Sequence, residues 1–260
     1  MEPMTSPLAP QPPPFASVTQ REITVGGLVG TTLAVWWRNA FKFAGLTLLL
    51  LIPVFVLGIG AAITVGRLGA EGIAGSAWMG FLPAILVMVT MLVSMGSLTY
   101  GAVQHLAERP VRFGEMLAVG FRRALPVLAA GVVLYVIVIA GTFLLVVPGI
   151  ILGCALSVVI PAVVVERCGP IAALKRSWEL TREHRFAIFA SWFVMWLVLL
   201  GINAALQITM KLLGELAVFL TLPVGLFMMA LPVLMPAVAY HDLRAAKEGT
   251  ASEELARVFE

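Results

Sequence analysis

The chain has 260 residues, of which 60% are hydrophobic and only 12% charged, and its formal net charge is +3. Soluble globular domains carry about 25% charged residues, because polar side chains must cover their surface. The composition therefore argues against a soluble protein and predicts an all-α integral membrane protein whose main partner is the lipid bilayer. The weak positive balance gives no reason to expect a nucleic-acid partner.

The first 20 residues combine polar side chains with six prolines, at positions 3, 7, 10, 12, 13 and 14. They contain neither the basic start nor the apolar stretch of a secretory signal. We predict a disordered tail over residues 1–20, a membrane domain over 21–244 and a second tail over 245–260.

Six apolar segments within the membrane domain are long enough to cross a bilayer, which takes roughly 20 residues in a helix, with a lower limit near 17. None has a charged residue at its centre. The predicted spans are residues 41–65, 78–103, 124–147, 149–165, 187–208 and 216–240.

The third and fourth spans are joined only by Val146-Val147-Pro148-Gly149. Because Pro followed by Gly marks turns, we predict a tight hairpin at this point. The alternative is one kinked helix, which would leave five spans and move the C-terminus to the other side of the membrane.

Lysine and arginine are distributed very unevenly between the two sides that six spans define. One side receives only Arg67 and Lys211 of the 17 basic residues. Cytoplasmic segments are rich in Lys and Arg, so we predict both termini in the cytoplasm and a location in the cell inner (plasma) membrane. The residues of the basic side are Arg21, Arg38, Lys42, Arg109, Arg112, Arg122, Arg123, Arg167, Lys175, Arg176, Arg182, Arg185, Arg244, Lys247 and Arg257.

Three segments before the odd-numbered spans have apolar residues at helical spacing and basic residues near their ends. They cover residues 24–38, 112–123 and 170–183. Helices of this kind lie flat in the membrane interface with their apolar face toward the lipid. We predict three repeats, each an interfacial amphipathic helix followed by a transmembrane hairpin.

The stretch from Val146 to Phe189 resembles a group of bacterial and archaeal multi-pass membrane proteins. That group includes the membrane domain of some glycerophosphoryl diester phosphodiesterases and related families of unknown function. The resemblance implies a multi-pass fold and little about biochemistry. The phosphodiesterase activity of the fused members belongs to a separate soluble domain, which the sequence does not contain. The ending from Tyr240, YHDLRAAKEG, is similar as well. The motif residues, to which we assign structural roles, are Pro148, Gly149, Pro161, Glu166, Gly169, Pro170, Ser177 and Trp178.

Basic clusters beside the amphipathic segments are the candidate functional residues. They are Arg122, Arg123, Lys175, Arg176, Arg182 and Arg185. Each cation near an anionic membrane surface adds about 1 kcal/mol of attraction, so these residues are candidates for binding lipid headgroups. The same residues could serve topology alone. Glu166 and Arg167 are either a headgroup-binding ion pair or an ordinary charged pair at the end of a span.

No catalytic residues, metal ligands or cofactor are predicted, because the histidines and cysteines have no ligand spacing and no nucleophile has a base nearby in the sequence. We therefore expect a non-enzymatic protein that organises lipids or partner proteins at the cytoplasmic face. A homo-oligomer or another membrane protein is a candidate partner. The alternative is a transporter or permease component for a lipid-like or apolar solute, suggested by prolines within the spans.

Overall fold

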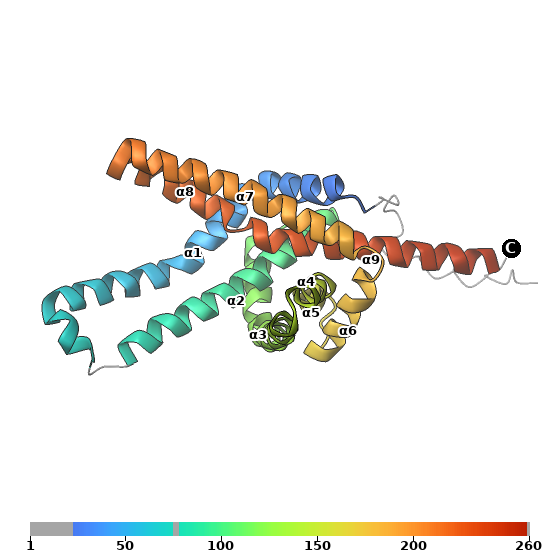
Figure 1. Cartoon of the computed structure of the whole chain (residues 1–260), viewed down its shortest axis with the longest axis horizontal. Helices are drawn as coiled ribbons and strands as arrows, with labels where there is room; N and C mark the ends of the chain where they lie inside the picture. The colour runs from blue at the N-terminus through green and yellow to red at the C-terminus, as the bar shows by residue number, and fades with distance from the viewer. Residues whose placement is uncertain (1–22, 75–77, 259–260) are drawn as a thin grey trace, which may run out of the picture.

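The computed structural model describes residues 23–74 and 78–258, and every regular element within them is a helix (Figure 1). The all-helical prediction is therefore confirmed, while the predicted tail over 1–20 lies outside the described residues. The elements are α1 (Val25–Ala74), α2 (Trp78–Leu106), α3 (Phe113–Leu144), α4 (Val146–Ala155), α5 (Val159–Val165), α6 (Pro170–Thr181), α7 (Arg185–Leu213), the 3₁₀ helix η1 (Gly214–Ala217), α8 (Val218–Met228) and α9 (Leu231–Val258). The predicted C-terminal tail is helical as far as Val258, because α9 continues through it.

Five described segments are long and apolar enough to cross a membrane. They are Val25–Gly60, Pro83–Leu106, Phe113–Phe143, Val146–Val165 and Arg185–Glu248. The last segment is not straight. It reverses at Gly214, whose φ of +57° is in the left-handed region that glycine adopts without strain, so α7 and α8 lie against each other as two arms.

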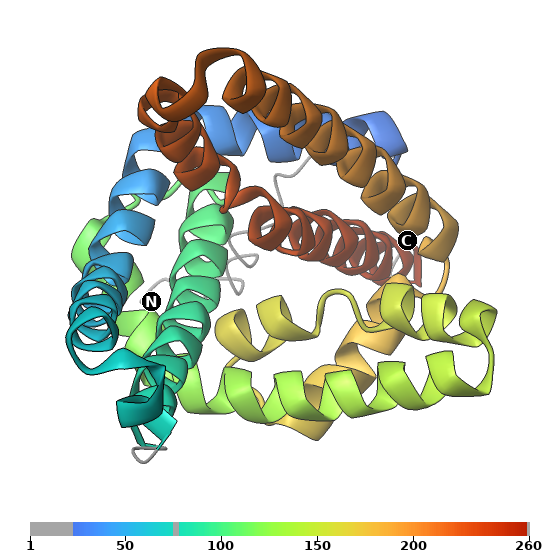
Figure 2. The same ribbon diagram turned by 60° about the vertical axis from the view of Figure 1, so that its left-hand side comes forward.

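Three helical hairpins extend in different directions from one region of the molecule (Figures 1 and 2). We call this region, where the ends of α2, α5, α6 and α9 meet, the base. They are formed by α1 with α2, α3 with α4, and α7 with α8, and each pair is in contact. Large apolar side chains on the hairpins are exposed, among them Phe143 and Phe219, at 92% and 82%. Apolar surface of this extent is unusual for a protein surrounded by water.

The hairpin between α3 and α4 reverses at Leu145, three residues before the predicted Pro148. Leu145 has extended backbone angles, and Pro148 is the third residue of α4, where its missing N–H costs nothing. Gly149 lies against the preceding arm, and a Cβ there would overlap Thr142. The close packing of the two arms thus explains the glycine, and a single kinked helix is not observed.

Two of the three predicted amphipathic segments are not separate helices. Residues 24–38 and 112–123 form the beginnings of α1 and α3, which continue without interruption into the next predicted span. No Gly or Pro stands at the first junction, and at the second Pro126 lies within the uninterrupted α3. The long α1 is bent, and its first part lies beside α7 while the remainder runs along α2 (Figures 1 and 2). Only the third segment, α6, ends before its span, at a turn over residues 182–184.

Two predicted spans that we expected to be continuous are broken. The fourth is interrupted at residues 156–158 and the sixth at 229–230. In both cases the second piece carries a proline in its first turn, Pro161 in α5 and Pro232 in α9. A proline in the first turn needs no hydrogen-bonded N–H, so each break falls where proline is tolerated.

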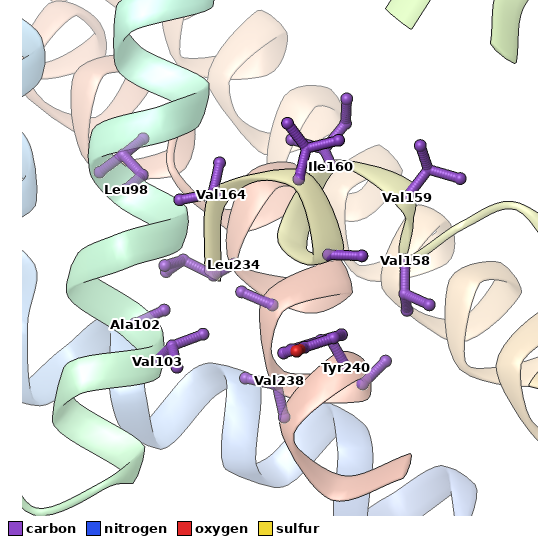
Figure 3. Packing of buried hydrophobic residues seen from close by; sticks show 14 of the residues in the cluster. Leu98, Ala102, Val103, Val158, Val159, Ile160, Val164, Leu234, Val238 and Tyr240 are labelled. Carbon is purple, nitrogen blue, oxygen red and sulfur yellow. The ribbon is translucent and has the colours of Figure 1, made fainter. Parts of the chain in front are cut away.

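The buried core lies at the base, around α5. Its residues from Val159 to Val164 are all buried, and they face Leu98 and Ala102 of α2 and Leu234 of α9 (Figure 3). This core fixes the ends of α2, α5, α6 and α9 relative to one another. Polar side chains at those ends form the candidate site.

Candidate functional site

A network of hydrogen bonds and ion pairs at the base joins α5, α6 and α9. Glu166 Oε1 accepts hydrogen bonds from Arg176 Nε and from the Tyr240 hydroxyl, both at 2.8 Å. Glu248 Oε1 accepts from Arg176 Nη2 at 3.0 Å and from Arg244 Nε at 2.8 Å. We call these five residues the Glu166 network. Two carboxylates thus neutralise two guanidinium groups.

Local sequence places each member of the Glu166 network. Glu166 is the residue that ends α5, and Gly169 followed by Pro170 starts α6 with proline at its first helical position, where proline is favoured. Tyr240, Arg244 and Glu248 are spaced by four residues and so share one face of α9. The Arg244 Nη1 also donates to the Tyr240 hydroxyl at 3.3 Å, which completes the network.

The network keeps Arg176 charged although it is largely removed from water. Burial by itself lowers the pKa of Arg176, but the hydrogen bond and charge of Glu166 and the charge of Glu248 outweigh burial and raise the pKa above its ordinary value. The side chains of Arg176 and Glu166 are only 27% and 21% exposed. The pair therefore links α5 to α6, and two nitrogens of Arg176 already donate to carboxylates.

The hydroxyls of Ser177 and Thr181 lie at the break between α4 and α5, close to a carbonyl that the break leaves without its helical donor. Val159 N–H donates to Leu156, so the carbonyl of Ala155 lacks the donor that a continuous helix would supply. The hydroxyls of Ser177 and Thr181 are each 2.9 Å from that carbonyl oxygen, and both side chains are fully buried. The Thr181 hydroxyl is also 2.8 Å from the Ser177 carbonyl, and its single proton serves one of the two.

The remaining cations of the third basic segment lie apart from one another. The Arg185 guanidinium stacks over the Trp178 ring at 4.0 Å, a cation–π contact. Lys175 and Arg182 are exposed. The structure therefore does not gather the six candidate lipid-binding residues into one site.

A second group of arginines surrounds a cavity of about 520 Å³ beside α2, α3 and the end of α5. Arg109, Arg122, Arg123 and Arg167 line it, and we call it the arginine pocket. None of the four side chains makes an ion pair or hydrogen bond within the described part of the chain, and no carboxylate lines the cavity. Arg167 therefore belongs to this pocket and is not the partner of Glu166.

A third feature is an apolar cavity of about 560 Å³ where the three hairpins diverge. Its wall includes Leu134 of α3, Trp192 of α7 and Val233 of α9. Gly131 and Gly153 also line it, and a Cβ at either position would meet nothing within 4 Å. The cavity therefore has room for larger side chains or for an apolar ligand.

The fold and these sites define a class: an all-helical protein with several apolar helices of membrane-spanning length and a polar base. Residues 105–241, just over half of the chain, match the family model described as Domain of unknown function (DUF7847). The chain belongs to that family. The comparisons with curated proteins and with solved structures found no match. The matched region contains the whole arginine pocket except Tyr100, Val103 and Gln104, and it ends before Arg244.

The sequence predicted structural roles for Glu166 and Ser177, but it did not indicate which residues they contact. Tyr240 belongs to the C-terminal stretch noted for its resemblance, but 74 residues separate it from Glu166, and no local pattern links the two. Arg109 was interpreted only as a topological charge, and Arg167 was considered only together with Glu166. Both stand in loops that follow a helix, α2 and α5 respectively, and this was the available signal, since loops at one side of a bundle lie near one another.

Proposed function

We propose that this chain is an integral membrane protein with six spans in three hairpins, located in the cell inner membrane with both termini in the cytoplasm. The exposed apolar hairpins support the bilayer location, since lipid is the solvent that such surface requires. The reversal at Gly214 supports six spans, because it divides the longest apolar segment into two arms. The basic base supports the orientation through the positive-inside bias.

We further propose that the protein is not an enzyme and that its base binds anionic lipids, so that the protein organises lipid at the cytoplasmic face. One observation carries this proposal: the base holds four arginines without acidic partners in the described chain, beside apolar helices of membrane-spanning length. Cations in that position attract anionic headgroups by about 1 kcal/mol each. Glu166, the acidic residue nearest to an exit from a span, is already occupied by Arg176 and Tyr240.

The test compares purified full-length protein in nanodiscs of phosphatidylcholine and in nanodiscs containing phosphatidylglycerol. A lipid that binds the folded state preferentially raises the unfolding temperature. We expect an increase of several degrees in the anionic nanodiscs, together with retained phosphatidylglycerol in native mass spectra. Equal stability and no retained anionic lipid would contradict the proposal.

The apolar cavity favours a second candidate function, a permease component for a lipid-like or apolar solute. Broken helices such as α4–α5 and α8–α9 occur in transporters, where they surround a central site. Filling the cavity with Gly153→Leu should abolish retention of a pyrene-labelled fatty acid without unfolding the protein. Gly58→Leu, at an exposed glycine of α1 with open space around it, is the matched control. Equal retention in both variants would count against this function.

We also propose a relationship to the membrane domain found in some glycerophosphoryl diester phosphodiesterases. Its support is physical, because the motif residues have roles that any relative with the same fold needs. Gly149 allows the α3–α4 hairpin, Pro170 starts α6, and Ser177 binds the broken end of α4. A solved structure of such a membrane domain without these three contacts would contradict the relationship.

A further inference from the structure

We propose that the arginine pocket binds the headgroup of one phospholipid that carries at least two negative charges, such as two phosphodiester groups or one phosphomonoester. This inference rests on the proposed function and specifies its ligand. It concerns a single built site and differs from a general attraction between a basic surface and an anionic membrane.

The pocket is built from three parts of the chain that meet only in the folded protein. Arg109 follows the end of α2, Arg122 and Arg123 lie on α3, and Arg167 follows the end of α5. The contacts between α2, α3 and α5 hold these parts together. Val103 and Val164 line the pocket and also belong to the buried core, which connects the pocket to the packed part of the fold (Figure 3).

The positive charge of the pocket favours a ligand that carries more than one negative charge. Four arginines line one cavity, and like charges that share a cavity repel one another, so an anion bound among them is favoured. Arginine binds phosphate through two parallel N–H donors, so four arginines offer more donors than a single monoanionic phosphodiester can accept. A headgroup with two charges matches the site better.

A neutral donor adds to the cations. Tyr100 lines the pocket, and its hydroxyl accepts a hydrogen bond from Gln104 Nε2 at 2.7 Å. Its oxygen is thus already engaged as an acceptor, while its own proton has no acceptor within the described residues. That proton is available to a phosphate oxygen.

The rest of the lining indicates a lipid as the source of the phosphate. Ala107, Val119 and Val165 give the pocket an apolar wall beside the arginines. A free phosphate has nothing to place against such a wall, whereas the glycerol and first acyl carbons of a phospholipid do. The two predicted cytoplasmic loops also meet here, since Arg109 and Arg167 line the same pocket, and loops at the ends of spans lie beside the headgroups of a bilayer.

Backbone strain is concentrated in the same two loops. Among the described non-glycine residues, Glu108 and Arg167 have positive φ, at 55° and 56°. Glu108 directly precedes Arg109, and Arg167 lines the pocket itself. Conformations of this kind cost about 1–3 kcal/mol and cluster at ligand-binding sites.

The experiment measures binding of cardiolipin, which has two phosphates, and of phosphatidylglycerol at the same total charge, by native mass spectrometry of full-length protein in neutral detergent. The pocket variant is Arg122→Gln with Arg123→Gln. The matched control is Arg112→Gln with Arg182→Gln, which removes the same charge from exposed positions outside the pocket. Tyr100→Phe removes only the hydroxyl.

We expect the unmodified protein to bind one cardiolipin at least tenfold more tightly than phosphatidylglycerol. The pocket variant should bind cardiolipin about 30-fold more weakly, since two cations at about 1 kcal/mol each correspond to that factor. The control should change cardiolipin affinity less than about twofold, and Tyr100→Phe should weaken it about fivefold, as expected for one hydrogen bond. If the pocket variant fails to fold, the Tyr100→Phe result decides.

Three outcomes would overturn the inference. Equal losses in the pocket and control variants would show a diffuse surface attraction, which contradicts this site while the proposed function survives. Stabilisation by inorganic pyrophosphate in phosphatidylcholine nanodiscs, equal to that by cardiolipin, would assign the pocket to a soluble ligand. No preference for any anionic lipid over phosphatidylcholine would contradict the proposed function itself.

Discussion

Two groups of arginines lie at the base of the protein, and they differ in whether their charge is matched. In the Glu166 network, Arg176 and Arg244 are neutralised by Glu166 and Glu248 at hydrogen-bond distances. In the arginine pocket, four arginines face one cavity without a carboxylate. The comparison indicates that the first group stabilises the fold and that the second is available for a ligand.

The comparison also separates residues that resemble one another in the sequence. Arg123 and Arg176 both follow an apolar pattern at helical spacing next to another basic residue. Arg176 meets two acids in the folded chain, whereas Arg123 makes no ion pair within the described part. Removing a charged side chain should therefore destabilise the Glu166 network and leave stability nearly unchanged at the arginine pocket.

Replacing Glu166 by Ala should cause the largest loss of stability, because it removes the acceptor of both Arg176 and the buried Tyr240 hydroxyl. Breaking a largely buried pair on one side costs about 2–3 kcal/mol. The free energy of unfolding in neutral detergent measures the change. Glu166→Gln keeps one acceptor oxygen and should lose less. Unchanged stability in Glu166→Ala would show that the Glu166 network does not stabilise the fold.

Removing both hydroxyls that serve the Ala155 carbonyl should cost about 1–2 kcal/mol, because a buried acceptor is then left without a donor. The variant is Ser177→Ala with Thr181→Val, and each single replacement is its control. Since either hydroxyl can serve the carbonyl alone, the single losses should add up to less than the double loss. Strictly additive losses in a double-mutant cycle would contradict this sharing.

Glu248→Ala should have a small effect on the same network, about 0.5 kcal/mol, because the Glu248 side chain is 40% exposed and water screens its pairs. The loss should shrink further in 1 M salt, where the screening length is about 3 Å. Unfolding measured with and without salt tests this. A loss as large as that of Glu166→Ala would show that the two carboxylates are equivalent, contrary to their burial.

Replacing Arg122 and Arg123 together by Gln should change stability in neutral detergent by less than about 0.5 kcal/mol, because the pocket arginines make no partner contacts within the described chain. A slight gain is expected from reduced repulsion between like charges. The same measurement in cardiolipin nanodiscs should show a clear loss relative to the unmodified protein. A loss of more than 1 kcal/mol in neutral detergent would remove the contrast with the Glu166 network.

The apolar segments could be located from the sequence because the signal is local. Runs of about 20 apolar residues identify the arms of all three hairpins, and the turn between α3 and α4 was placed within three residues. The breaks at 156–158 and 229–230 had no such signal. Neither Leu156-Ser157-Val158 nor Met229-Ala230 contains glycine or proline, and the first break persists because Ser177 and Thr181, about 20 residues away, satisfy the freed carbonyl.

The sequence by itself determined that the protein is helical and that its helices include several long apolar segments, because composition and periodicity depend only on neighbouring residues. It also determined how many arginines the chain has and where they stand relative to the apolar segments. Which of them have a partner was decided only by the tertiary structure. Ion pairs such as Arg176 with Glu248 join residues 72 positions apart, and no local pattern records such a contact. The core around α5 brings the ends of α2, α5, α6 and α9 together, and that packing separates the neutralised arginines from those that surround an open pocket.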